Sequence, residues 1–513
     1  MKNRNFYLLF ALLLMACSLP SITGFLNQDA ALSYSGVVFN PIDGYTYLAK
    51  MQIGKSGEWL FTLPYTPLAG EGRLLYPFYI AAGHSLRLLG VDQAVGFTLL
   101  RLVSYFLLVL SIVRLTSSVF SENQNTASLG TILAAFGGGL GWVMLPFGKF
   151  GADFWISEAF PFLSGLANPH FPLALCLMTV IILIPNTGIR NWTSLILILT
   201  GIGLSVLSPF GFILTASILA GSWIWEKADG INTSIWPVIF FVISGVPYCV
   251  YQYWAVHSTP QLAAWTAQNL TPSPAAWDVF LTFSPWIGLI VVSWKEIFRL
   301  RKLRTVRHLV VWVILGLVFT LIPFNLQRRF MIGLSIPFTV LGLLALPFAA
   351  KKIRISIAKM QTICTSLVLI TPILLVVMTT MAIATHNDMY YYKKGEKDVI
   401  LWLSQQGDGR HLTMASGETG LLIPSLSRLR IVYGHPFETV NAEKALNTVE
   451  IFYEDKDMIG LESELSIIQE NQVEWVMYGA NEKELGSPAI LKGQEPAFES
   501  NEVKVYDVRD LLP

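Results

Sequence analysis

Runs of about twenty apolar residues recur along most of this 513-residue sequence. A helix needs about 20 such residues to cross the hydrocarbon core of a bilayer. A longer apolar stretch, 192–225, is interrupted at Ser208-Pro209, because proline has no amide N–H to donate and ends or kinks a helix. We therefore expect two short helices there and eleven membrane spans in all. The nine others are predicted near 6–25, 97–116, 128–147, 167–185, 233–255, 277–294, 309–324, 331–349 and 361–384.

The charged residues divide the sequence into two regions. Residues 1–384 contain 23 Lys or Arg and 12 Asp or Glu, whereas residues 385–513 contain 12 and 22. The first region is as poor in charge as a lipid-embedded body, and the second is as rich as a water-soluble acidic domain. We predict a membrane domain, 1–384, and a second domain, 385–513. A nucleic-acid partner is disfavoured, because the sequence has no cluster of Lys and Arg next to a nucleic-acid-binding motif.

Lysine and arginine also predict an orientation. The strongest basic segments are 295–307 and 351–359, and Lys2 and Arg4 precede the first span. Loops rich in these residues stay in the cytoplasm. Eleven alternating spans that begin in the cytoplasm satisfy both segments. The sequence thus predicts a multi-pass plasma-membrane protein with a cytoplasmic N-terminus. The segments 26–96, 148–166, 256–276 and 325–330, and the acidic C-terminal domain, are then extracytoplasmic.

Residues 74–90 are apolar but are expected not to span the bilayer. The segment is short for a span and contains His84 and Arg87. Counting it as a span would also reverse the orientation of every later loop. We interpret it as a helix that lies in the outer interface, at the end of the first outer loop, 26–96.

Several polar side chains gather in the predicted outer segments. Asp43 follows Asn-Pro in the first loop, so it is a candidate base or a simple helix cap. Arg328 and Arg329 are candidates to bind a phosphate, or anchors that extend toward water from the interface. The other candidate substrate-binding residues are Arg73, Glu158, Asn168 and His170. Solvation is the default for Glu158, and Asn168-Pro169-His170 also fits the start of a helix.

The C-terminal region alternates short strands with amphipathic helices, which predicts a small α/β sheet. Strands are expected at 412–415, 430–433, 473–478 and 503–508, and helices near 441–453 and 460–471. The strand at 430–433 leads into Gly434-His435-Pro436-Phe437-Glu438-Thr439. Binding groups often follow strand ends in such sheets. His435 and Glu438 are therefore candidates to bind an acceptor, although turn and cap roles explain them equally well.

The order of elements in the first loop resembles that of GT-C glycosyltransferases, which use polyprenyl-phosphate sugars. The most similar patterns are those of protein O-mannosyltransferases and aminoarabinose transferases. Asp43 matches the family's catalytic aspartate, and Tyr47 falls at its following aromatic position. Gly57-Glu58-Trp59 matches a turn, Arg73 stands near the family's basic residue, and Leu88-Leu89-Gly90 closes the surface helix. The resemblance implies an all-α polytopic membrane fold with a small extracytoplasmic α/β domain.

The resemblance also implies a reaction. A sugar would move from a polyprenyl phosphate to an extracytoplasmic acceptor by inverting displacement, with Asp43 as the base. Guanidinium groups suit the donor phosphate, because they present a planar fork of donors. The resemblance specifies no definite cofactor and allows a divalent metal. Some members use a divalent metal, but Gly44 stands here in place of the second acid. The sugar, the acceptor and the lipid length are not specified.

Two other classes of protein fit the composition. A transporter or lipid flippase usually shows internal repeats with matching broken helices. The sequence shows one broken segment, at Ser208-Pro209, and no partner for it. A non-catalytic scaffold with a binding outer domain is the third alternative. It explains the large first loop with Asp43 least well.

Overall fold

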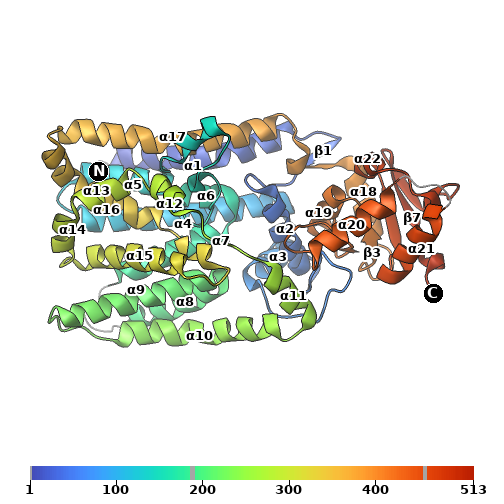
Figure 1. Cartoon of the computed structure of the whole chain (residues 1–513), viewed down its shortest axis with the longest axis horizontal. Coiled ribbons are helices and arrows are strands. Elements are labelled where there is room, and N and C mark those ends of the chain that lie inside the picture. The colour runs from blue at the N-terminus through green and yellow to red at the C-terminus, as the bar shows by residue number, and fades with distance from the viewer. Residues whose placement is uncertain (1–2, 185–190, 455–458) are drawn as a thin grey trace. The chain divides into compact units, whose positions relative to one another are not determined.

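The computed structural model describes residues 3–184, 191–454 and 459–513 (Figure 1). The chain divides into two compact units. The first, here called the helical unit, comprises Met1–Ile22, Leu99–Val250 and Thr271–Met381. The second, here called the mixed unit, comprises Thr23–Thr98, Tyr251–Leu270 and Ala382–Pro513. The whole of the predicted first outer loop, 26–96, therefore belongs to the same unit as the C-terminal region.

Apolar helices build the helical unit. Their bounds are α1 (Asn3–Asn27), α4 (Gln93–Val119), α5 (Gln124–Phe136), α6 (Pro161–Ala167), α7 (His170–Leu183), α8 (Asn191–Leu207), α9 (Pro209–Ala228), α10 (Trp236–His257), α12 (Ala276–Thr282), α13 (Trp286–Val292), α14 (Trp294–Leu300), α15 (Arg304–Leu321), α16 (Ser335–Ile353) and α17 (Ile357–Ala384). Helices α8, α9 and α10 lie side by side (Figure 1). The ring of Phe212 on α9 stacks on that of Phe241 on α10, with centroids 5.1 Å apart.

Six helices among the described residues are long and apolar enough to cross a membrane: α1, α4, α10, α15, α16 and α17. A bent pair, α5 with the 3-10 helix Gly141–Phe147, would make a seventh. Helices α7 and α8 are apolar but shorter. These helices make the chain a multi-pass membrane protein, and the count of eleven spans stays a prediction. Residue 185 and Lys2, which were used in that prediction, lie outside the described residues.

The structure tests two predictions about apolar segments, the break at Ser208 and the single span at 277–294. The break at Ser208 is confirmed, because its hydroxyl accepts the amide N–H of Gly211 and caps α9. Residues 277–294, predicted as one span, instead form α12, α13 and the start of α14. Pro285 precedes α13, and its missing N–H prevents a continuous helix. The break at Ser208 thus has a counterpart elsewhere among the described apolar segments.

The mixed unit contains a five-stranded sheet of order β4-β3-β5-β7-β6. Strand β3 runs parallel to β4 and β5, while β7 is antiparallel to β5 and β6. The predicted strands coincide with β3 (Leu412–Met414), β4 (Arg430–Ile431), β5 (Trp475–Tyr478) and β7 (Val503–Asp507), and β6 (Phe498–Ser500) was not predicted. A separate antiparallel pair joins β1 (Leu32–Tyr34) to β2 (Tyr391–Lys393).

The remaining elements of the mixed unit are helices. They are α2 (Pro41–Lys55), α3 (Pro77–Leu89), α11 (Pro260–Gln268), α18 (Lys394–Leu403), α19 (Gly417–Leu426), α20 (Ala442–Tyr453), α21 (Ile459–Asn471) and α22 (Ala480–Leu485). Buried Tyr45 and Leu48 of α2 share one hydrophobic cluster with Trp475 and Met477 of β5, so α2 is anchored to the core of the sheet. Alternate residues of a strand face opposite sides, and Val476 accordingly belongs to a different cluster.

Helix α3 forms the predicted interfacial segment and packs closely on α2. A Cβ atom added to Gly54 would lie 1.9 Å from the carbonyl oxygen of Ile80, and one added to Gly83 would lie 1.9 Å from that of Met51. Glycine is therefore required where the two backbones cross. The exposed Leu88 and Leu89 at the end of α3 fit contact with a bilayer surface, which remains a prediction.

Candidate active site

Asp43 lies in the first turn of α2, and the sequence before it explains why. Asn40 takes a left-handed conformation (φ 47°), and Pro41, which needs no N–H partner, begins the helix. The cap position belongs to Asn40, so the interpretation of Asp43 as the cap is wrong. The Asn40 side-chain amide donates to one carboxylate oxygen of Asp43 at 2.5 Å. The Asp43 side chain is 49% exposed, so its carboxylate is both held by Asn40 and partly accessible to solvent.

His435 faces the other oxygen of this carboxylate. Its Nε2 lies 3.9 Å from Asp43 Oδ1, across nearly four hundred residues of sequence. The Nδ1 atom accepts the amide N–H groups of Phe437 and Glu438, both at 3.0 Å. The ring proton therefore sits on Nε2, toward Asp43. Burial lowers the pKa of His435 to about 4, so the imidazole is neutral at physiological pH.

A buried ion pair lies two turns further along α2, and the sequence analysis missed it. Lys50 is 2% exposed, and its Nζ lies 2.8 Å from Glu438 Oε1. The rings of Tyr76 and Tyr47 flank the ammonium, with centroids 4.2 and 4.9 Å away. The seven-residue spacing from Asp43 to Lys50, which puts both on one helix face, was the available signal. Two residues of one loop, His435 and Glu438, therefore contact this face of α2.

The Gly57-Glu58-Trp59 turn is fixed by charge and by stacking. Glu58 pairs with Arg410 at 2.8 Å and with Arg428 at 3.1 Å. The Trp59 ring stacks on His84 with centroids 4.1 Å apart. The turn thus ties the end of α2 to α3 and to the C-terminal sheet.

Arg73, a predicted substrate-binding residue, is engaged by its neighbours. Its guanidinium pairs with Glu71 at 2.8 Å, donates to the hydroxyl of Ser258 at 3.2 Å and lies over the ring of Trp254. Its backbone pairs with that of Phe61 in an isolated bridge. The side chain is therefore held near the segment Tyr251–Leu270 of the mixed unit, which contains α11 and the end of α10.

The other candidates belong to the helical unit. Arg328 and Glu158 are brought together, with Arg328 Nε 3.6 Å from the Glu158 carboxylate. Arg329 instead lies over the ring of Phe210.

Asn168 and His170 flank the junction of α6 and α7. Asn168 ends α6 and is buried, and His170 begins α7 against the ring of Phe171. The interpretation of Asn168-Pro169-His170 as a helix start is confirmed, and a binding role for these two residues stays a prediction.

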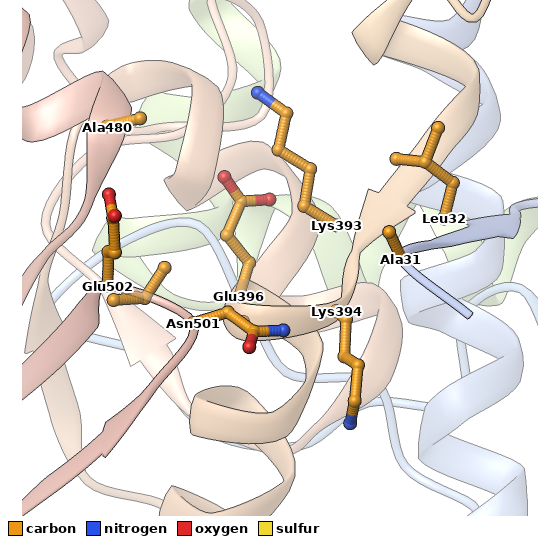
Figure 2. A pocket seen from close by; sticks show the side chains of 10 residues that line it. Ala31, Leu32, Lys393, Lys394, Glu396, Ala480, Asn501 and Glu502 are labelled. Carbon is orange, nitrogen blue, oxygen red and sulfur yellow. The ribbon is translucent and has the colours of Figure 1, made fainter. Parts of the chain in front are cut away.

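A cavity of about 290 Å³ opens beside α18 (Figure 2). Lys393, Lys394, Asn501 and Glu502 surround it, together with the buried Glu396. Asn481 donates to the Glu396 carboxylate at 3.3 Å. Burial raises the pKa of Glu396 from 4.5 to about 7.

Replacing Glu396 with glutamine should stabilise the protein at alkaline pH. Because the pKa of Glu396 is raised on folding, its proton stabilises the folded state below pH 4.5, and that stability is lost as the pH rises to about 7. We expect Glu396→Gln to raise the free energy of unfolding by about 1–3 kcal/mol at pH 8 and to leave it unchanged at pH 4. Unfolding of both proteins at the two pH values measures this. Glu495→Gln, at an exposed position that does not contribute to the pKa shift of Glu396, is the control, and equal effects of Glu396→Gln at both pH values would contradict the assignment.

Solved structures of membrane transferases share the architecture of the whole chain. An oligosaccharyltransferase from Archaeoglobus fulgidus has a TM-score of 0.53 and 14% identity, over 92% of this chain and 70% of its own. ArnT from Cupriavidus metallidurans, bound to undecaprenyl phosphate, has a TM-score of 0.51 and 12% identity, over 99% of both chains. The mycobacterial arabinofuranosyltransferase AftD has a TM-score of 0.50 and 10% identity, over 99% of this chain and 40% of its own. The chain has the GT-C fold.

This fold is shown by structure alone. No protein-family model matches the chain, and no curated protein matches it in sequence. The GT-C resemblance read from the first loop is confirmed at the level of the fold.

A divalent metal, which some GT-C enzymes use, is not favoured by the residues around Asp43. Gly44 follows it in the chain, and a lone carboxylate with a neutral imidazole is a poor donor set for a hard cation. Within the described parts of the chain, no three His, Cys, Asp or Glu side chains gather as metal ligands.

Proposed function

We propose that this chain is a membrane glycosyltransferase that moves a sugar from a polyprenyl-phosphate donor to an extracytoplasmic acceptor. The fold supports this, since solved GT-C proteins carry dolichol phosphate and undecaprenyl phosphate. The observation that carries the proposal is the half-exposed Asp43 carboxylate, fixed on the first turn of α2. A side chain that served packing alone would not need to be both held and open to solvent.

Asp43 acts in the proposed reaction as the general base. Its carboxylate takes the proton of the acceptor hydroxyl, whose oxygen forms a bond to the anomeric carbon as the bond to the phosphate oxygen breaks. The sugar leaves the polyprenyl phosphate with inversion. The phosphate departs as an anion, and cationic side chains lower the energy of the charge that develops on it.

Arg328 and Arg329 are the groups we assign to the donor phosphate. Arg328 is one-quarter exposed and shared with Glu158, so its guanidinium retains donors for a further anion. Glu158 would orient Arg328, while Arg73, Asn168 and His170 are secondary candidates. The orientation that the basic loops predict puts the N-terminus in the cytoplasm and the mixed unit outside.

A transfer assay tests the function directly. The full-length protein in nanodiscs would be incubated with a panel of polyprenyl-phosphate sugars and candidate glycan, lipid and peptide acceptors. We expect release of polyprenyl phosphate coupled to glycosylation of one acceptor class. Movement of the lipid-linked sugar across vesicle bilayers without transfer would instead identify a flippase. No turnover and no lipid movement with any donor would favour the scaffold alternative.

The arginine assignment predicts a difference between arginine and lysine. Arg328→Lys or Arg329→Lys keeps the charge but loses the planar two-point contact, so donor affinity should fall. Alanine should weaken it further, because a charge-assisted hydrogen bond contributes about 1.5–3 kcal/mol. Donor binding by each variant in matched nanodiscs is the measurement. Anchors that only extend to water would be replaced by lysine without loss, so equal affinities at both positions would remove these residues from the site.

A further inference from the structure

The loop that contains His435 is held rigidly by its own hydrogen bonds. The hydroxyl of Thr439 accepts the amide N–H groups of Gly434 and His435, at 3.4 and 3.2 Å. The Thr439 amide returns a bond to the His435 carbonyl at 3.1 Å. At Gly434, an added Cβ would lie 2.6 Å from the backbone of Gly420 in α19. This loop, residues 434–439, therefore has little freedom to move its side chains.

The His435 ring is fixed within this loop and cannot itself reach a substrate. It is 1% exposed, and its Nδ1 is occupied by two backbone N–H groups. Its remaining nitrogen, Nε2, lies 3.9 Å from Asp43 Oδ1, and the backbone of Ile42 is a hydrogen-bond partner of the ring. The ring of Tyr65 is tilted against it, with centroids 5.8 Å apart, and Lys50 and Glu438 are the charged groups that affect its pKa. Asp43 is the half-exposed group among these neighbours, so it is the route by which His435 can influence a substrate.

We propose that His435 is a positioning residue for Asp43, which donates from Nε2 to Oδ1 while Asn40 donates to Oδ2. This inference rests on the proposed function. The two donors fix the plane of the carboxylate, whose side chain is 49% exposed. The 3.9 Å separation in the substrate-free protein would shorten when the substrate binds, as catalytic hydrogen bonds commonly do. In this proposal, the C-terminal region contributes His435, which lies in the loop after β4.

Kinetics of matched variants test the positioning role. We expect His435→Ala to lower kcat about 10–100-fold with little change in the KM for the donor, and to move the acidic limb of the pH–rate profile upward. His435→Gln should restore most of the rate, because the glutamine amide can donate from the Nε2 position. In an Asp43→Asn background, His435→Ala should have little further effect, since the two act as a unit. His411→Gln is the control, because His411 lies just before β3 and pairs with Glu474 rather than with Asp43.

A spectroscopic measurement keeps the inference independent of the activity. Full-length protein with ¹⁵N-labelled histidine would be compared with His435→Gln, which identifies the His435 signals. We expect Nδ1 without a proton and Nε2 with one at pH 7, and a change of the Nε2 signal in Asp43→Asn but not in Asp408→Asn.

The two experiments separate the two proposals. If the wild-type protein transfers no sugar, the proposed function fails, while the Nε2 signal still decides whether His435 binds Asp43. Full kcat in a folded His435→Ala variant, or an Nε2 signal that ignores Asp43→Asn, would overturn the positioning role.

Discussion

Replacing Asp43 with asparagine should lower the rate of sugar transfer at least about 100-fold while the protein remains folded. General-base catalysis contributes about 10²–10⁴ to a rate, and the amide has no basic lone pair with which to accept the proton. Asparagine is nearly isosteric and keeps one acceptor oxygen for Asn40 or His435, although its amide nitrogen cannot accept from the other. The measurement is kcat for the donor and acceptor identified in the panel assay, with thermal unfolding as the test of folding.

A matched variant distinguishes two roles of Asp43. One is that of the general base, and the other is that of a negative charge which stabilises the N-terminus of its helix. Glu443 is an exposed acid in the first turn of α20, one position nearer to the helix start than Asp43 is in α2. Both changes remove a negative charge that favours the helix N-terminus by about 0.3–1 kcal/mol. Glu443→Gln should therefore leave transfer within a few-fold of the wild type. Similar rates for Asp43→Asn and Glu443→Gln would return Asp43 to a structural role.

Removing the carboxylate of Glu438 should strongly destabilise the mixed unit. Glu438→Leu leaves the ammonium of Lys50 buried without its carboxylate partner, and breaking a buried pair from one side costs about 3–5 kcal/mol. The surrounding rings of Tyr47 and Tyr76 offset only part of that cost. Replacing both partners, as Lys50→Met with Glu438→Leu, should restore most of the lost stability, because no unpaired charge remains.

An exposed pair supplies the comparison for this effect. Glu499 lies 3.9 Å from Lys504 at the edge of the sheet, with both side chains more than one-third exposed. Glu499→Gln should change the free energy of unfolding by less than about 1 kcal/mol, as is usual for surface pairs. Thermal unfolding of the four proteins in one detergent gives the ranking. If the Glu438 single variant and the double variant unfold at the same temperature, the pair is not the source of the stability.

The features that the sequence determined are those with a local physical cause. Apolar runs give helices, because a segment of that length must satisfy its own backbone hydrogen bonds in lipid. The Ser208-Pro209 break follows from one missing N–H and one capping hydroxyl. The strand at 412–414 follows from its short apolar run. The position of Asp43 on the first turn of α2 is set by Asn40 and Pro41 next to it.

Hydropathy did not predict the helix boundaries correctly in every apolar segment. Hydropathy gave residues 277–294 the appearance of one span, because composition does not register where proline and packing interrupt a helix. The structure divides that segment at Pro285.

The tertiary structure alone decided which polar groups act together. Lys50 and Glu438 are 388 residues apart, and no periodicity joins them. The sequence around His435 fits a turn residue equally well, and only the fold shows that its Nε2 lies near Asp43. Arg328 and Glu158 likewise meet only through the packing of distant segments. Burial and charge pairing depend on which surfaces exclude water together, and that depends on contacts between segments remote in the chain. The sequence by itself therefore determined the helices, strands and candidate residues, and the tertiary structure determined their partners.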